Sequence, residues 1–232
     1  LAKRGCSVLI NYAQSTASAE GVREEVKALG VGAAVFQGDI ADDAVCRGMV
    51  DAAVAAFGRL DILVNNAGTT RFIPHSDLDA VTDEVWSRLM EVNLKAPFQC
   101  ARAARPHLEE GGSGEIVSVA SVAAFTGRGS CIPYCASKAA LVTMTKSLAR
   151  IMGPAIRVNA VAPGFIKGDW LREGVGENYE AFLAEKEAEA PLQNACAPED
   201  VAAAILSLIE GSDLVTGETL TWDGGHSLGG GF

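Results

Sequence analysis

Two side chains that could share a proton lie one helical turn apart, at Tyr134 and Lys138. Residues four apart on a helix project from the same face, so the phenol and the ammonium would lie side by side. A cation beside a phenol favours the phenolate and lowers the phenol's pKa. Ser121, thirteen residues before Tyr134, could supply a second hydrogen bond. This spacing predicts a proton-transfer site, and the alternative is a surface Tyr–Lys pair on an ordinary helix.

The composition favours one large α/β domain. The chain has 232 residues, of which 49% are hydrophobic and 6% aromatic, enough to bury a sizeable core. Abundant small aliphatic residues suit helices that pack on a buried parallel sheet. The net charge of −10 argues against a nucleic-acid or anionic membrane surface, so neither is an expected partner.

The cysteines and histidines show no metal-ligand spacing, and we expect no metal site. The chain has six cysteines and three histidines, all scattered. Cys131 and Cys135 flank Tyr134, and we interpret them as small, mostly buried apolar residues. No apolar run approaches the length of a bilayer span. A reducing cytoplasm is the expected compartment.

Short apolar segments alternate with longer amphipathic ones along the chain. This alternation predicts βαβ units, and therefore a doubly wound parallel sheet with helices on both faces. We expect a single domain over residues 1–232. The expected strands are 7–11, 33–37, 60–65, 114–119, 156–161 and 218–223. The expected helices are 15–29, 42–57, 131–152, 177–188 and 198–209, with 81–106 helical for much of its length and 165–196 otherwise irregular.

Polar or glycine-containing segments follow four of the predicted strands. They are Asp39, the turn 65–68, Ser121 and the pair Pro163–Gly164. In a parallel sheet the carboxyl ends of the strands meet at one edge, where such folds bind ligands. The sequence therefore predicts a site at that edge.

These residues together resemble the short-chain dehydrogenase/reductase family over essentially the whole chain. The spacing is specific, because Asn93 precedes Ser121 by twenty-eight residues and Ser121 precedes Tyr134 by thirteen. The turn 65–68, Pro163–Gly164 and the segment 223–225 after the last strand add to the likeness. Within the family, 3-oxoacyl-[acyl-carrier-protein] reductases are similar. The resemblance implies a Rossmann-type fold that binds a dinucleotide.

The resemblance also implies a division of labour. Tyr134 would donate a proton to the carbonyl oxygen during reduction and remove one from the alcohol during oxidation. Lys138 would lower the phenol's pKa and contact the nicotinamide ribose, Ser121 would orient the carbonyl, and Asn93 would hold a water. Two donors at one point would stabilise the negative charge that hydride transfer builds on oxygen.

Further positions match the family's cofactor contacts. They are Asn11 at the end of a strand, Asp39 and Ile40 at the adenine, Asn66, Ala67 and Gly68 at the ribose and pyrophosphate, Pro163, Gly164 and Ile166 at the nicotinamide, and Tyr134 and Lys138 themselves.

The sequence favours NADP over NAD. An acidic residue at the end of the strand expected over 7–11 would bond the ribose hydroxyls of NAD and repel the extra phosphate of NADP. The chain has Asn11 and Tyr12 there, and no acid.

The chain departs from the family pattern at two places. The first strand and its glycine-rich turn, about 20 residues, are absent, and Leu1 to Gly5 resembles the end of the helix that follows them. We therefore expect an N-terminally incomplete domain whose mid-sheet neighbours have unpaired backbone groups. The second departure is Gly168, where the family commonly has threonine.

The predicted function is hydride transfer between NADP(H) and a carbonyl or alcohol substrate, a 3-oxoacyl thioester or a smaller ketone. The resemblance implies a homodimer or homotetramer formed through the helices that carry Asn93 and Tyr134. One alternative is a serine-type esterase that uses Ser121 with Lys138 and Tyr134. Another is a non-catalytic domain that acts by oligomerisation.

Overall fold

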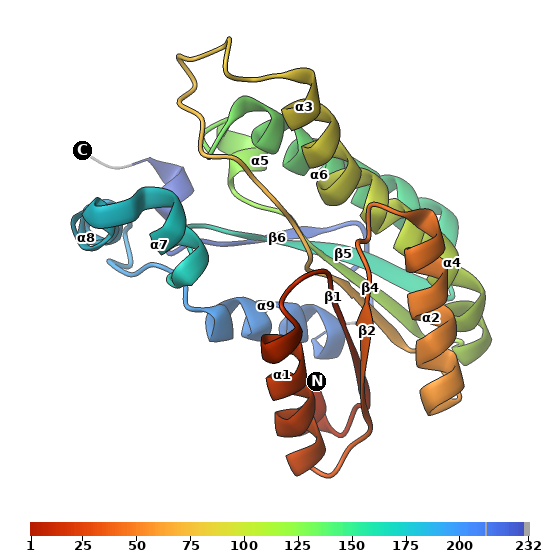
Figure 1. The fold of residues 1–232 in the computed structure, drawn as a ribbon. Helices are drawn as coiled ribbons and strands as arrows, with labels where there is room; N and C mark the ends of the chain where they lie inside the picture. Colours follow the sequence, from red (N-terminus) through yellow and green to blue (C-terminus); the bar gives the residue numbers. More distant parts are fainter. Residues whose placement is uncertain (212, 230–232) are drawn as a thin grey trace.

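The protein folds as an α/β domain in which every strand pairing is parallel (Figure 1). The computed structural model describes residues 1–211 and 213–229. Two strands pair in one sheet and four in a second, in the order β3-β4-β5-β6. The strands are β1 (Val8–Tyr12), β2 (Ala33–Gln37), β3 (Ile62–Asn65), β4 (Gly114–Val119), β5 (Ile156–Pro163) and β6 (Thr219–Trp222).

The strand side chains alternate between two apolar layers, as the period of two requires. Ile116 of β4 and Val158 of β5 join a core formed with α2, α4 and α6. Val117 of β4 and Val161 of β5 join a second core formed with α9. Helices therefore cover both faces of the larger sheet, and Figure 1 shows α9 on the side opposite α4. The predicted doubly wound arrangement is confirmed.

The helices alternate with the strands along the chain. The α-helices are α1 (Thr16–Ala28), α2 (Asp43–Phe57), α3 (Asp83–Met90), α4 (Ala96–Gly111), α5 (Ala123–Thr126), α6 (Ile132–Met152), α7 (Asp169–Val175), α8 (Tyr179–Glu189) and α9 (Pro198–Glu210). Shorter turns are η1 (Ala2–Arg4), η2 (Glu91–Lys95), η3 (Gly176–Asn178) and η4 (His226–Leu228). No helix in the described part of the chain is long and apolar enough to cross a membrane.

The sheet is interrupted between β1 and β3. Within the described residues β1 pairs with β2, and β3 pairs with β4. All five residues of β1 are only half buried, whereas seven of the eight residues of β5 are buried. Among the described residues, β1 and β3 therefore each have one strand edge without a paired strand.

The segment 81–106, which we expect to be helical for much of its length, is helical from Asp83 onward but is divided into three parts. The structure has α3 and α4 with η2, a turn of π-helix, between them. One turn of π-helix inserts an extra residue into a helix and commonly marks a functional position. The helical path also continues past Pro106 to Gly111. Gly112 ends it in the left-handed conformation, with φ 74°, which glycine adopts without steric cost.

The irregular segment expected over 165–196 contains more helix than predicted. The helix expected at 177–188 is present as α8, but α7, in the same segment, was not predicted. The four-residue α5, which lies outside this segment and follows β4, was not predicted either. Both missed helices are short and begin without a side-chain cap. Their sequences therefore carry neither the apolar period nor the capping residues that identify longer helices.

A buried ion pair holds the edge of the sheet that is opposite the predicted site. Arg157 Nη2 lies 2.7 Å from Glu115 Oε1, and both side chains are mostly buried. Arg157 also donates to the carbonyl oxygens of Leu208 and Ile209, at the end of α9. Burial raises the pKa of Glu115 to about 7. The pair therefore joins β4, β5 and α9 at the end of the sheet remote from Ser121.

Candidate active site

The structure brings the predicted catalytic residues together from three different elements. Tyr134 and Lys138 lie one turn apart on α6, and Ser121 lies two residues beyond β4. Asn93 is in η2 and is 1% exposed. Because β4 is in the middle of the sheet, between β3 and β5, its carboxyl end faces the loops that follow both neighbouring strands.

Lys138 is an almost fully buried ammonium group. It is 5% exposed, and its Nζ donates to the backbone oxygen of Val119 at 2.7 Å. Burial lowers its pKa to about 8, because desolvation penalises the charged form. Its Nζ lies 5.8 Å from the centre of the Tyr134 ring. The charge is therefore close to the phenol and oriented by a carbonyl of β4.

The expectation that the lysine lowers the pKa of Tyr134 is wrong for this structure. Burial raises that pKa, and a hydrogen bond with the Ser121 hydroxyl opposes the rise only in part. Desolvation therefore dominates the shift in the pKa of Tyr134. A phenol with a raised pKa keeps its proton at neutral pH and is a hydrogen-bond donor. In this protonation state Tyr134 can donate its proton to an oxygen atom.

The arrangement does not support the Ser–Lys esterase hypothesis. Such a pair needs the amine beside the serine hydroxyl as a general base. Here the Lys138 ammonium donates to Val119, whereas the Ser121 Oγ accepts from the backbone N–H of Ala123 at 3.2 Å and lies near enough to Tyr134 to lower the pKa of that phenol. Ser121 is therefore positioned with the phenol and not with the amine.

Asn93 clamps the turn after β3 to α6. Its Oδ1 accepts from the backbone N–H of Thr69 at 2.8 Å, and its Nδ2 donates to the Thr69 oxygen at 2.9 Å. The same Nδ2 donates to Ser137 Oγ at 3.1 Å, and Ser137 donates to the Tyr134 carbonyl at 2.8 Å. The amide thus fixes two segments that carry site residues.

Sequence reasoning missed Thr69 and Ser137 as parts of the site. The signal for Ser137 is its place three residues after Tyr134 in the interior of a helix, where a serine hydroxyl commonly bonds a carbonyl of the preceding turn. Thr69 contributes its backbone groups, so its side chain gives no sequence signal.

The turn expected to contact the cofactor lies beside Lys138. Asn66, Ala67 and Gly68 are exposed at the end of β3. A Cβ on Gly68 would lie 3.6 Å from Lys138 Nζ and 3.4 Å from Asn93 Oδ1. The backbone at Gly68 therefore approaches the two polar groups closely, as a ligand-binding turn at this edge requires.

The residues predicted at the adenine end are already engaged in protein contacts. Asn11 Nδ2 donates to the backbone oxygens of Phe36 and Gly38, each at 3.1 Å, and so ties β1 to the end of β2. Asp39 forms an ion pair with Arg88 at 2.8 Å. Its pKa is lowered, first by the N–H of Ala41 and then by Arg88. The Ile40 oxygen accepts from Cys46 Sγ at 3.2 Å.

The residues predicted at the nicotinamide end pack against the last strand. Gly164 donates its N–H to the Trp222 oxygen at 3.0 Å, and a Cβ there would lie 2.8 Å from the Cβ of Asp223. Pro163 is the last residue of β5, and Ile166 forms an isolated parallel bridge with Cys196. The close packing of β5 on the 223 segment is thus a structural reason for the glycine.

Gly168 departs from the family pattern for a reason that the backbone shows. Its φ is 141° with ψ −177°, a region that only glycine readily occupies. Its N–H donates to the Tyr179 hydroxyl at 3.1 Å. A threonine would be strained in this backbone conformation.

Comparison with known proteins agrees with the fold and with this geometry. A family model described as enoyl-(acyl carrier protein) reductase matches residues 1–227. A ketoacyl reductase named for the granaticin polyketide synthase of Streptomyces violaceoruber is 41% identical over 229 residues, 98% of this chain and 89% of that protein. The 3-oxoacyl-[acyl-carrier-protein] reductase FabG of Staphylococcus aureus is 36% identical over 227 residues, 97% of this chain and 89% of that protein.

Two solved structures show the same fold with different nicotinamide cofactors in their names. The NADPH-dependent 3-quinuclidinone reductase of Rhodotorula rubra has a TM-score of 0.85 at 29% identity. The match covers 98% of this chain and 84% of the reductase chain. An NAD⁺-bound xylitol dehydrogenase has a TM-score of 0.87 at 25% identity. The match covers 97% of this chain and 90% of the dehydrogenase chain. The chain belongs to the short-chain dehydrogenase/reductase family and is an oxidoreductase by that membership.

Replacing Asn93 with alanine should loosen the site without removing any titrating group. The change leaves the Thr69 N–H and carbonyl without their partner, which costs about 1–3 kcal/mol for each buried unsatisfied group. We expect the urea midpoint to fall. Ser137→Ala is the matched comparison, because it removes only one of the three bonds that Asn93 makes, and its midpoint should fall less. Equal losses in the two variants would contradict the clamp.

Proposed function

We propose that the chain catalyses NADP(H)-dependent reduction of a carbonyl compound, with the reverse alcohol oxidation at the same site. The observation that carries the proposal is the buried Lys138 ammonium between the turn 66–68 and Tyr134. A buried cation beside a protonated phenol, a serine hydroxyl and an exposed turn at the strand ends is the arrangement that carbonyl reduction requires.

The roles of the side chains follow from their protonation states. Tyr134, whose pKa is raised, donates its proton to the carbonyl oxygen as that atom gains negative charge. Ser121, hydrogen-bonded to the phenol, donates to the same oxygen and orients it. Lys138 holds its positive charge below pH 8 and stabilises the phenolate that remains. The bound nicotinamide supplies the hydride.

The chain's own residues fit the nicotinamide half of a dinucleotide. Gly68 would contact the ribose, and Lys138 lies directly beneath this turn, so one ammonium serves both the ribose and the phenol. Asn66, Ala67 and the Pro163 to Ile166 segment border the same edge, because they lie at the carboxyl ends of β3 and β5, the two strands that flank β4.

NADP is the proposed cofactor in preference to NAD. No acidic residue follows β1, since its last residues are Asn11 and Tyr12 and the next are Ala13 and Gln14. Ser15 begins α1 without forming a side-chain cap bond. Its hydroxyl and the partial positive charge at the helix start favour an additional phosphate. Similarity to an NADPH-dependent reductase supports this choice, and similarity to an NAD⁺-bound dehydrogenase shows why it needs a test.

The proposed substrate is a 3-oxoacyl thioester or a related ketone, in the cytoplasm. Two relatives named as ketoacyl and 3-oxoacyl reductases support the substrate class. All six cysteines are free thiols, which is typical of a reducing compartment.

Replacing Tyr134 with phenylalanine tests the proposal directly. NADPH should bind the wild-type chain saturably, as measured by nicotinamide fluorescence, and the variant should bind it as well. The reduction rate of a 3-oxobutanoyl thioester should fall about 10²–10⁴-fold, because the proton donor is lost. Ser207→Ala, a hydroxyl deletion on α9, is the control and should retain wild-type turnover.

Two outcomes would contradict the proposal. Near-normal turnover by the phenylalanine variant would refute Tyr134 as the proton donor. Absence of saturable NADPH binding by the 232-residue chain would refute the oxidoreductase function for this form of the protein.

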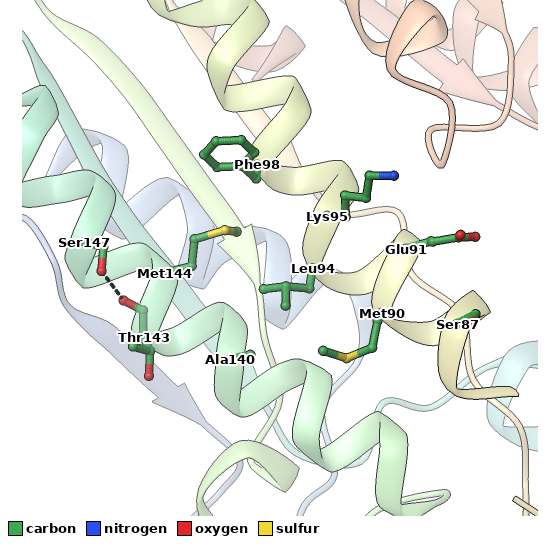
Figure 2. A pocket seen from close by; sticks show the side chains of 10 residues that line it. All are labelled: Ser87, Met90, Glu91, Leu94, Lys95, Phe98, Ala140, Thr143, Met144 and Ser147. Atoms are coloured by element: carbon green, nitrogen blue, oxygen red, sulfur yellow. Dashed lines mark hydrogen bonds between the residues drawn. The ribbon is translucent and has the colours of Figure 1, made fainter. Parts of the chain in front are cut away.

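We further propose a homodimer or homotetramer that pairs through the helical segments that carry Asn93 and Tyr134, which are η2 with α4 and α6. An open hollow of about 820 Å³ lies between α3, η2 and the start of α4 on one side and α6 on the other, as Figure 2 shows. Met90, Leu94 and Met144 lie along it, and Phe98 is 42% exposed. The α6 side is formed by small residues spaced three or four apart, Ala140, Thr143 and Ser147. Small residues opposite exposed apolar ones allow two helix pairs to approach closely.

Replacing the exposed Thr143 with arginine should dissociate this assembly. The charge would lie in the centre of the paired face, where burying it unpaired is unfavourable. Light scattering should give two or four chain masses for the wild type and half of that mass or less for the variant. Val22→Arg, on the exposed surface of α1, should leave the mass unchanged. Equal masses for the wild type and the Thr143 variant would contradict the interface.

A further inference from the structure

An aromatic contact crosses the mouth of the site. Phe72 follows β3, and Trp170 lies in α7, which follows β5. Their ring centres are 5.9 Å apart, with the ring planes inclined at 58°. Because β4 lies between β3 and β5, this contact spans the carboxyl end of β4, where Ser121 lies. The paths of the two segments from the sheet can be followed in Figure 1.

Phe72 lies directly on Gly174 of α7. A Cβ at position 174 would fall on the Phe72 ring, well inside van der Waals contact with its Cζ, Cε1 and Cε2 atoms. Gly174 has an ordinary helical backbone and not a positive φ. The glycine therefore provides space for this ring, rather than a special conformation.

The segment that meets Phe72 is stiffened by its own contacts. The Tyr179 hydroxyl accepts from the Gly168 N–H, and the Arg172 guanidinium lies 4.1 Å from the Tyr179 ring centre. Arg172 also pairs with Glu180 at 3.0 Å. At its base, Lys167 pairs with Glu187 at 2.6 Å. These contacts tie α7 to α8, so the two helices form one unit whose far side rests on Phe72.

The opposite wall is also fixed to the site. The backbone N–H of Ile73 donates to the Ser130 oxygen at 2.9 Å, and Thr70 and Ser130 share a hydrogen bond through their hydroxyls. Ser130 lies four residues before Tyr134. Phe72 is thus held between two anchored residues, and its ring position is linked to the start of α6.

Large aromatic surfaces at this mouth remain in contact with solvent. Phe72 is 44% exposed and Trp170 51% exposed, although each contacts the other. Exposed aromatic pairs at the edge of a ligand site are typical surfaces for binding apolar groups. A short carbonyl compound reacting at Ser121 would not need this surface, whereas one with a long apolar chain would extend past it.

We propose that Phe72 is a specificity-determining residue: seated on Gly174, it holds α7 across the site and, with Trp170, binds the apolar chain of the carbonyl substrate. This proposal rests on the proposed reductase function. It makes Phe72 selective for chain length and leaves proton transfer to Tyr134. The contact of the Phe72 ring with Gly174, here called the latch, belongs to the fold. It can therefore be tested by a measurement that does not depend on catalysis.

The first experiment is a double-mutant cycle on the latch, read by limited trypsin cleavage within α7 and α8, at Arg172 and Lys186. Phe72→Ala and Gly174→Ala should each speed cleavage about 3- to 10-fold, the scale of one aromatic contact. The double variant should cleave no faster than Phe72→Ala alone, since the added methyl then enters space that the ring has left. Gly21→Ala, in open space on α1, is the control.

The second experiment measures reduction of 3-oxobutanoyl and 3-oxodecanoyl N-acetylcysteamine thioesters. Phe72→Ala should raise the KM for the longer thioester about 10-fold, with kcat and both constants for the shorter one little changed. Phe72→Leu, which keeps an apolar side chain, should fall between the two. Leu78→Ala, an exposed residue on the same loop, is the control for loop truncation.

Each outcome bears on the proposal separately from the proposed function. Additive cleavage effects, or unchanged cleavage in both single variants, would overturn the latch. If the cleavage effects are non-additive, as expected, but the KM of Phe72→Ala for the longer thioester is unchanged, the role of Phe72 in specificity would be overturned. If the wild type reduced neither thioester, the proposed substrate class and the role in specificity would fail together, while the cleavage cycle would still decide the latch.

Discussion

The burial of one ammonium group constrains the rest of the site. Lys138 gives up most of its hydration and retains one short hydrogen bond to the Val119 carbonyl, the last residue of β4. Desolvating a charge is costly unless polar groups compensate for the lost hydration. Burial lowers the pKa of Lys138 to about 8, so the compensation is incomplete. The strand end, the turn at Gly68 and the phenol must all remain close for this charge to be tolerated, so the geometry of the site and the stability of the ammonium are coupled.

The same burial explains why a protonated phenol and a cation coexist. Tyr134 and Lys138 are both desolvated, and desolvation moves their pKa values in opposite directions, upward for the acid and downward for the base. Each shift favours the neutral form, and at neutral pH the phenol is neutral while the amine still holds its proton. The unfolded chain binds the lysine proton more tightly between pH 8 and 10.5, so this group makes stability rise with pH in that window.

Sequence patterns predicted the strands and long helices well because their apolar periods are strong. The strand 114–119 and the pairing of Tyr134 with Lys138 on one helix face follow from local rules, and the structure confirms both. The π-turn at Asn93 was not predictable, because its extra residue is set by the contacts of the amide with Thr69 and Ser137. The rise in the pKa of Tyr134 was also missed, since spacing reports which groups are neighbours and not how much water they lose. Phe72 on Gly174 joins positions 102 residues apart, beyond any periodic signal.

Titration of the Lys138 side chain by NMR is the most direct test of the central claim. In the protein without added cofactor, the ¹⁵Nζ and ¹³Cε shifts of Lys138 should titrate with a midpoint near pH 8. A Lys138 midpoint at the ordinary lysine value of about 10.4 would show that the ammonium is hydrated and would contradict the account.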